Sequence, residues 1–183
     1  RPSQEGVYRH IMAVVEATDL PVMIYDIPGR TGVRIEDGTL ARLAEHPRVL
    51  AVKDATGDVE QGFCRMEATG LEYYSGDDGL NFAWLAHGAS GMVSVVAHAD
   101  AHSWRQMVTE VDAGDLAGAR AVAQRMRPLV RAMMGGGQGA VMAKEALLLQ
   151  GRIPSAALRL PLVRASQTEV EALRTTLATC GLL

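Results

Sequence analysis

Residues 49–57 of this chain read VLAVKDATG, an apolar run that ends in a lysine and passes into a turn. Short apolar runs bounded by turn residues are typical of strands buried on both faces. Lysine is scarce here, because arginine supplies all but two of the 18 basic residues and the only other lysine is Lys144. Lys53 is therefore the first candidate for chemistry, since lysine, unlike arginine, can lose its proton at accessible pH and form a Schiff base with a carbonyl carbon.

Strand and helix patterns alternate on both sides of this stretch. Ser3 is a good helix N-cap, and apolar residues then recur at helical spacing up to Val15. The expected strands are residues 20–25, 49–53, 71–74 and 91–96. The expected helices lie at about residues 3–17, 35–44, 58–67 and 80–86, with a loop at residues 27–32.

The alternation predicts a parallel sheet covered by helices. From residue 101 onward the pattern is almost entirely helical, in two or three segments, with breaks near residues 135–137 and 152–154 and a last helix at residues 167–178. Four strand–helix units make half of an eight-stranded barrel, and half a barrel leaves unpaired strand edges. We therefore expect an α/β chain. Residues 1–100 would form the C-terminal half of a TIM (β/α)8 barrel, and residues 101–183 would form the last barrel helix and a helical C-terminal extension of a longer protein.

Composition argues against several classes of function. The net charge of −3 is spread along the chain, so no nucleic-acid partner is expected. No apolar stretch approaches the roughly 20 residues of a membrane span. Cys64 and Cys180 lack metal-ligand spacing and indicate free thiols in a reducing cytoplasm. His98 and His102 stand four residues apart, but no acidic residue completes a zinc motif, so no metal site is expected.

Reactive or polar groups stand at the carboxyl ends of the expected strands, the edge where parallel α/β folds build their sites. Tyr25 ends the strand before that of Lys53, and neighbouring strands lie about 4.8 Å apart. If both side chains point into the barrel, desolvation favours the neutral amine of Lys53, and the phenol can relay a proton to an adduct on it. A lysine that reaches solvent and a tyrosine that contacts water are the alternatives.

Three further residues could contact a substrate. Arg30 lies in the loop PGRTG, and its planar guanidinium suits a carboxylate, although a solvated surface arginine is the alternative. Gly76 would let the backbone approach a ligand closely. The next residue, Asp77, either caps the following helix or binds a substrate hydroxyl or amine.

Five segments, in order along the chain, resemble the dihydrodipicolinate synthase (4-hydroxy-tetrahydrodipicolinate synthase) family of pyruvate-dependent class I aldolases. They are RPSQEG at residues 1–6, YDIPGRTG at 25–32, VKDATG at 52–57, SGDD at 75–78 and GMVSV at 91–95. The arginine-rich composition suggests an actinobacterial type of member. Asp26 stands where many members have asparagine, and the resemblance places the first half of the barrel, with its own site residues, outside this chain.

The resemblance implies a lyase of lysine (diaminopimelate) biosynthesis. In that reading Lys53 forms an imine with pyruvate, Tyr25 relays protons, and Arg30 holds the carboxylate of L-aspartate 4-semialdehyde. Gly76, Asp77 and the Val93 backbone would lie at the substrate. No metal or dissociable cofactor is implied, because the imine is the electron sink. The family also implies a cytoplasmic homotetramer acting on small molecules.

Alternatives within and outside this superfamily stay open at this point. N-acetylneuraminate lyase and keto-deoxy sugar acid aldolases share the lysine and the tyrosine, but Arg30 followed by Thr31 favours a small aldehyde that bears a carboxylate. A non-catalytic keto-acid-binding paralogue is the alternative from another class, and the presence of both Lys53 and Tyr25 argues against it. The 183 residues by themselves are expected to be inactive and poorly folded, because half a barrel cannot close.

Overall fold

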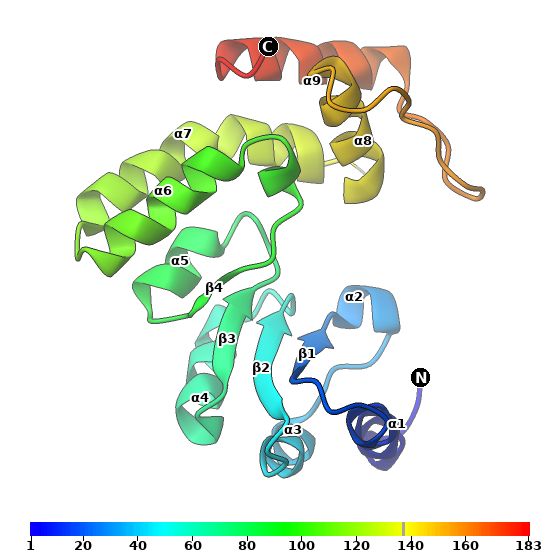
Figure 1. Ribbon diagram of the computed structural model, residues 1–183, viewed down its shortest axis with the longest axis vertical. Coiled ribbons are helices and arrows are strands. Elements are labelled where there is room, and N and C mark those ends of the chain that lie inside the picture. The colour runs from blue at the N-terminus through cyan, green and yellow to red at the C-terminus, as the bar shows by residue number, and fades with distance from the viewer. Residues whose placement is uncertain (137) are drawn as a thin grey trace. The chain divides into compact units, whose positions relative to one another are not determined.

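The computed structural model describes residues 1–136 and 138–183, so Gly137, part of the expected break at residues 135–137, lies outside the described residues. The described chain forms two compact units, Arg1–Val93 and Ser94–Leu183. The first unit holds one parallel sheet in the order β1-β2-β3-β4 (Figure 1). Its strands are β1 (Val22–Asp26), β2 (Val49–Asp54), β3 (Glu72–Ser75) and β4 (Gly91–Met92). The predicted parallel sheet is confirmed.

Helices connect successive strands of this unit, and local signals in the sequence set their ends. The Ser3 hydroxyl accepts a hydrogen bond from the Gly6 amide, and the Asp58 carboxylate accepts one from the Gln61 amide, so each side chain caps a helix. Gly70 ends the second of these helices in the left-handed conformation, with φ of 65°. The helices are α1 (Gln4–Glu16), α2 (Pro28–Thr31), α3 (Asp37–Ala44), α4 (Val59–Thr69) and α5 (Asn81–Ala86).

One face of the sheet packs against these helices and forms the core of the unit. Ile24, Val52 and Tyr73 stand opposite one another on three neighbouring strands, and all three are buried. They belong to one apolar cluster with Leu43 of α3 and Trp84 of α5. Full burial of side chains of this kind contributes about 1.5–3 kcal/mol each. The cluster therefore fixes which face of each strand is turned toward the helices.

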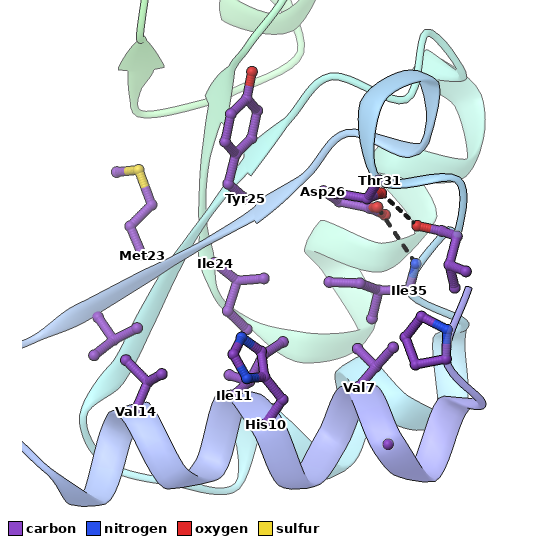
Figure 2. A pocket seen from close by; sticks show the side chains of 14 residues that line it. Val7, His10, Ile11, Val14, Met23, Ile24, Tyr25, Asp26, Thr31 and Ile35 are labelled. Atoms are coloured by element: carbon purple, nitrogen blue, oxygen red, sulfur yellow. Dashed lines mark hydrogen bonds between the residues drawn. The ribbon is translucent and has the colours of Figure 1, made fainter.

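The other face of the sheet carries the next residue of each strand. Tyr25, Lys53 and Tyr74 are partners in the strand register, one position after the buried row. Figure 2 shows Met23 and Tyr25 on the side of β1 opposite Ile24, and both are more than 40% exposed. Since side chains alternate along a strand, burying Ile24 puts Tyr25 on this second face.

Two local predictions differ from the structure. The expected loop at residues 27–32 contains α2, a single turn that Pro28 can begin because its φ is already helical, and that Gly32 ends in the left-handed region. The expected strand at residues 91–96 is paired only at Gly91–Met92, and η1 (Val96–His98) follows it. The Ser94 hydroxyl accepts a hydrogen bond from the Ala97 amide, which favours this turn over further extension.

The second unit is helical and contains α6 (Ala101–Asp112), α7 (Leu116–Met134), α8 (Gly139–Leu149) and α9 (Gln167–Thr179). The prediction of two or three helical segments after residue 101 was wrong, because Gly114 adopts φ of 79° and the Asp115 carboxylate caps a new helix there. Helix α7 packs against α6 and α9. No helix in the described part of the chain is long and apolar enough to cross a membrane.

The sheet leads to a prediction about the isolated chain. Within the described sheet, β1 and β4 each have a neighbour on one side only, and Met23 and Leu50 are at least 42% exposed. We expect the isolated 183-residue chain to melt without a cooperative transition, because unpaired edges and exposed apolar side chains favour association over a unique fold. Circular dichroism melts would measure this, with the full-length protein as the cooperative control. A single sharp transition of the isolated chain, seen at the same temperature in near- and far-ultraviolet signals, would contradict the prediction.

Candidate active site

The side chains of Tyr25 and Lys53 meet at the carboxyl ends of β1 and β2. The two residues are register partners, and the Lys53 amine nitrogen lies 3.8 Å from the centre of the Tyr25 ring. Lys53 is half-buried and Tyr25 is exposed, so the pair is open to a ligand. An ammonium group over an aromatic face is a favourable contact, which helps to hold the amine beside the phenol. The first two predicted site residues are therefore neighbours on one face of the sheet.

Backbone hydrogen bonds continue past the strands and bring the following loops to the same edge. The Ala55 amide donates to the Asp26 carbonyl at 2.9 Å, and the Gly76 amide donates to the Asp54 carbonyl at 2.7 Å. The Val93 amide donates to the Ser75 carbonyl at 2.8 Å. Gly76 and Val93 thus stand one and two strands beyond Lys53 along this edge.

In the part of the chain that the structure describes, Asp77 and Arg30 make no hydrogen bond or ion pair with Tyr25 or Lys53. The Asp77 carboxylate accepts a hydrogen bond from the Gly79 amide at 2.9 Å, and its carbonyl accepts one from the Ser75 hydroxyl at 3.0 Å. Both bonds belong to the turn after β3, and α5 begins later, after Leu80, with no side-chain cap, so the capping role that the sequence allowed for Asp77 is not observed. Arg30 is exposed on α2.

A layer of buried charge lies behind the pair. Asp26 and Asp54 are themselves register partners, each one residue after a member of the pair, and both are buried. Burial raises the pKa of Asp26, a hydrogen bond from the Ile35 amide opposes that rise, and the charge of Asp54 adds to it. The guanidinium of Arg65 on α4 bonds to the Asp26 carboxylate at 3.3 Å and lowers its pKa in turn.

Sequence reasoning missed Arg65. Its only local signal is helical spacing, because it lies three residues after the buried Gly62 and four before the half-buried Thr69. That stripe is interrupted by Arg65 itself, and a charged residue in a helix normally indicates the solvent face. Its partner Asp26 is 39 residues away in the sequence, so the pairing is visible only in the folded chain.

A cavity of about 510 Å³ lies between α1 and the open edge of β1 (Figure 2). Val7, Ile11 and Val14 of α1 line it together with Ile24. Tyr25 also reaches its wall, but neither Lys53 nor Arg30 does. A lining of this kind suits packing against apolar side chains more than binding of a charged keto acid. The candidate site is therefore the strand-end edge and not this cavity. No group of three or more acidic, histidine or cysteine side chains among the described residues is placed to hold a metal ion.

The geometry can be set beside known proteins. Residues 1–180 match the model of the Dihydrodipicolinate synthetase family. The chain belongs to this family. The resemblance that the five segments suggested is confirmed, and the match extends over almost the whole sequence.

Curated relatives and solved structures agree with the family model. A 4-hydroxy-tetrahydrodipicolinate synthase of Kineococcus radiotolerans is 50% identical over 182 residues, and one of Bifidobacterium longum is 45% identical over 183. All of this chain is covered in both comparisons, but only 59% and 61% of the relatives. The crystal structure of dihydrodipicolinate synthase from Thermotoga maritima matches with a TM-score of 0.94 at 36% identity, with all of this chain and 63% of that one covered.

These matches settle the fold class. The chain spans about three fifths of the length of its relatives and has the α/β architecture of the C-terminal half of a TIM barrel, followed by helices. The exposed face of the sheet and the open edge of β1 agree with a barrel that continues beyond these residues. The fold-class prediction is confirmed.

Gly76 offers a test of how closely the loops are packed at this edge. A methyl group on Gly76 would lie 2.8 Å from the Asp54 carbonyl oxygen, which is main chain and cannot easily move aside. We expect Gly76→Ala to destabilise the full-length protein by about 1–3 kcal/mol, the usual cost of overpacking. Urea denaturation would measure the change in the free energy of unfolding.

The matched control for this variant is Gly38→Ala on α3. Nothing lies within 4 Å of the added methyl group there, and alanine is the better helix former. The control should keep or slightly raise the free energy of unfolding. Equal stability of the two variants would show that the loop after β3 has room that the structure does not show.

Proposed function

We propose that the full-length protein condenses pyruvate with L-aspartate 4-semialdehyde to give 4-hydroxy-tetrahydrodipicolinate, a step of lysine (diaminopimelate) biosynthesis. The observation that carries this proposal is the Lys53 amine held 3.8 Å from the Tyr25 ring at adjacent strand ends. In a chain of this family, such a pair supplies a nucleophile and a proton relay within reach of one ligand. The names of the curated relatives give the same product.

Lys53 is proposed to form the covalent intermediate. Its neutral amine attacks the keto carbon of pyruvate, and the keto oxygen takes up a proton to give a carbinolamine. The phenol of Tyr25 carries the proton that lets this hydroxyl leave as water, and the imine remains. The positively charged imine then draws electrons from the neighbouring methyl carbon, which loses a proton to become an enamine. The chemistry needs no dissociable cofactor, because the imine accepts these electrons.

The second half of the reaction uses the aldehyde substrate. The enamine carbon attacks the aldehyde carbon of L-aspartate 4-semialdehyde, and the aldehyde oxygen takes up a proton. The amine of that substrate then attacks the imine carbon, closes the ring and releases the Lys53 amine. Both carbon–carbon and carbon–nitrogen bond formation take place at the carbon skeleton held on Lys53, so one lysine serves the whole sequence.

The remaining site residues are proposed to bind and orient the substrates. Arg30 would hold the carboxylate of the aldehyde substrate through two parallel hydrogen bonds. Gly76 and Val93 already use their amides in the strand-end ladder, so they would offer carbonyl oxygens and close approach. Asp77 would present its carboxylate at the same edge. The rest of the site would come from the missing part of the barrel, and we propose a cytoplasmic homotetramer as the working form.

We expect borohydride to trap pyruvate on Lys53 in the full-length protein. Reduction of the imine leaves a stable secondary amine, which mass spectrometry of peptides can assign. The chain offers a sharp control, because Lys144 is the only other lysine in this sequence. Lys53→Arg should abolish the adduct on this part of the protein, and Lys144→Arg should keep it. Absence of an adduct in the unmodified protein would favour a binding paralogue without catalysis.

We also expect Tyr25→Phe to lower kcat by about 10²–10⁴-fold, the usual contribution of a proton relay. The ring that contacts the Lys53 amine is kept, so pyruvate should still be trapped, although more slowly. Tyr74→Phe is the matched control, because Tyr74 flanks Lys53 on the other side and its hydroxyl donates to Glu72 at 2.9 Å. Equal losses of kcat in both variants would show that Tyr25 does not have its proposed role.

Steady-state assays with aspartate semialdehyde and with N-acetylneuraminate would separate the synthase reaction from that of the lyase relatives.

A further inference from the structure

Arg65 is buried on α4, one layer behind the strand-end site, and each of its three guanidinium nitrogens donates a hydrogen bond to a different residue. The side chain is only 5% exposed. Its Nε donates to the Asp37 carboxylate at 2.7 Å, one terminal nitrogen donates to the Asp26 carboxylate at 3.3 Å, and the other donates to the Ile35 carbonyl at 2.8 Å. Each partner belongs to a part of the chain other than α4.

The three partners stand at the two ends of one segment. Asp26 is the last residue of β1, Ile35 lies just before α3 and Asp37 begins it, so Arg65 bonds to both ends of the loop formed by residues 27–36. The Asp26 carboxylate also accepts a hydrogen bond from the Ile35 amide at 3.4 Å, drawn as a dashed line in Figure 2. This segment contains α2 and Arg30.

Helix α2 by itself has little to fix its position. It is four residues long, no side chain caps it, and none of its residues is buried. Inside the segment, the Thr31 hydroxyl bonds only to the Ile27 and Val33 carbonyls. The place of α2 relative to β1 therefore depends on the closed base of the loop. There Arg65 joins the Asp26 end to the Ile35 and Asp37 end, and Gln4 of α1 adds bonds to the Arg34 carbonyl at 2.8 Å and the Glu36 amide at 3.0 Å.

Only arginine can make this connection. Lysine could supply the positive charge, but it lacks the planar fork that reaches a carboxylate, a carbonyl and a second carboxylate at fixed angles. The charge itself is needed, because Asp26 and Asp54 are buried neighbours and a buried carboxylate without a partner is strongly unfavourable. The same guanidinium thus neutralises the strand end and closes the loop.

We propose that Arg65 is a positioning residue for the second substrate, through the loop that carries Arg30. This inference rests on the proposed function, in which Arg30 binds the carboxylate of the aldehyde. Loss of Arg65 removes the side chain that bonds to both ends of residues 27–36, which loosens the base of the loop, lets α2 shift and weakens that carboxylate contact. Tyr25 and Lys53 stay together, because the ladder between β1 and β2 holds them. Loss of Arg65 should therefore weaken the binding of the aldehyde and leave the binding of pyruvate unchanged.

The test compares Arg65→Met, Arg65→Lys and a matched surface variant, Arg42→Met, in the full-length protein. Arg42 also pairs with a carboxylate, that of Glu5 at 2.9 Å, but on the exposed side of α3. We expect Arg65→Met to raise the KM for aspartate semialdehyde about tenfold or more, a change of roughly 1.4 kcal/mol in binding. The KM for pyruvate and the yield of borohydride adduct should stay within about twofold of the unmodified protein. The KM of Arg65→Lys for aspartate semialdehyde should lie between those of the unmodified protein and Arg65→Met. Arg42→Met should change neither KM.

Two results would overturn the inference: an unchanged KM for the aldehyde in Arg65→Met, or an equal rise in both KM values, which indicates general loosening. If Arg65→Met does not fold, Asp37→Ala replaces it, since Asp37 is largely exposed and the variant loses the bond from Arg65 at 2.7 Å and those from Gln61 at 3.0 Å. It should raise the KM for the aldehyde in the same direction by a smaller factor, and no rise would count against the proposal.

Hydrogen exchange separates this inference from the proposed function. If the unmodified protein traps no pyruvate, the proposed function fails, and the structural claim can still be judged. Amides in residues 27–36, with that of Ile35 first among them, should exchange faster in Arg65→Met, while those of α1 should not change. Unchanged exchange in this segment would show that Arg65 does not hold the loop.

Discussion

The alignment of β1 with β2 is the constraint on which the rest of the site depends. Ile24 is partnered with Val52 and Tyr25 with Lys53, so burying one row of side chains against the helices exposes the other row as a reactive pair. A slip of one residue would exchange the two faces and put the lysine into the apolar core. The core of the unit therefore sets the chemistry of the opposite face, through nothing more than the alternation of side chains along a strand.

The residues that follow Tyr25 and Lys53 in their strands are two buried carboxylates, Asp26 and Asp54. Asp26 and Asp54 fall on the helix side of the sheet, where a carboxylate is costly unless it is paired. Asp54 accepts hydrogen bonds from the Thr56 amide and hydroxyl at 2.9 and 2.8 Å, and Asp26 bonds to Arg65 and to the Ile35 amide. Through these hydrogen bonds, each buried carboxylate connects the end of its strand to the loop that follows it. The site is held by its polar second layer as much as by the sheet.

Strand β1 is at the edge of the described sheet, so one of its sides has no neighbouring strand. The cavity beside it is lined by apolar residues of α1 and β1, and the face with Met23 and Tyr25 is exposed to solvent. The curated relatives match all of this chain with only about three fifths of their own length, so about two fifths of each relative lies outside the match. Apolar surface and unpaired backbone groups at one edge are what a closed barrel would remove. In the function that we propose, the candidate site at this edge is one part of a site that the whole barrel completes.

Much of this follows from sequence alone. The proposed nucleophile could be predicted because the scarcity of lysine, the apolar run before Lys53 and the turn after it are local features of the sequence. The order of the strands and helices could be predicted for the same reason, since helix caps such as Ser3 and Asp58 are also local. The β-branched run at residues 91–96 misled the prediction, because the hydrogen bond from the Ala97 amide to the Ser94 hydroxyl favours a turn there. Tertiary structure alone decided that Tyr25 meets Lys53 at 3.8 Å and that Arg65 closes the Arg30 loop. Those contacts join residues 28 and 39 positions apart, and only the packing of the core, which no local pattern encodes, brings them together.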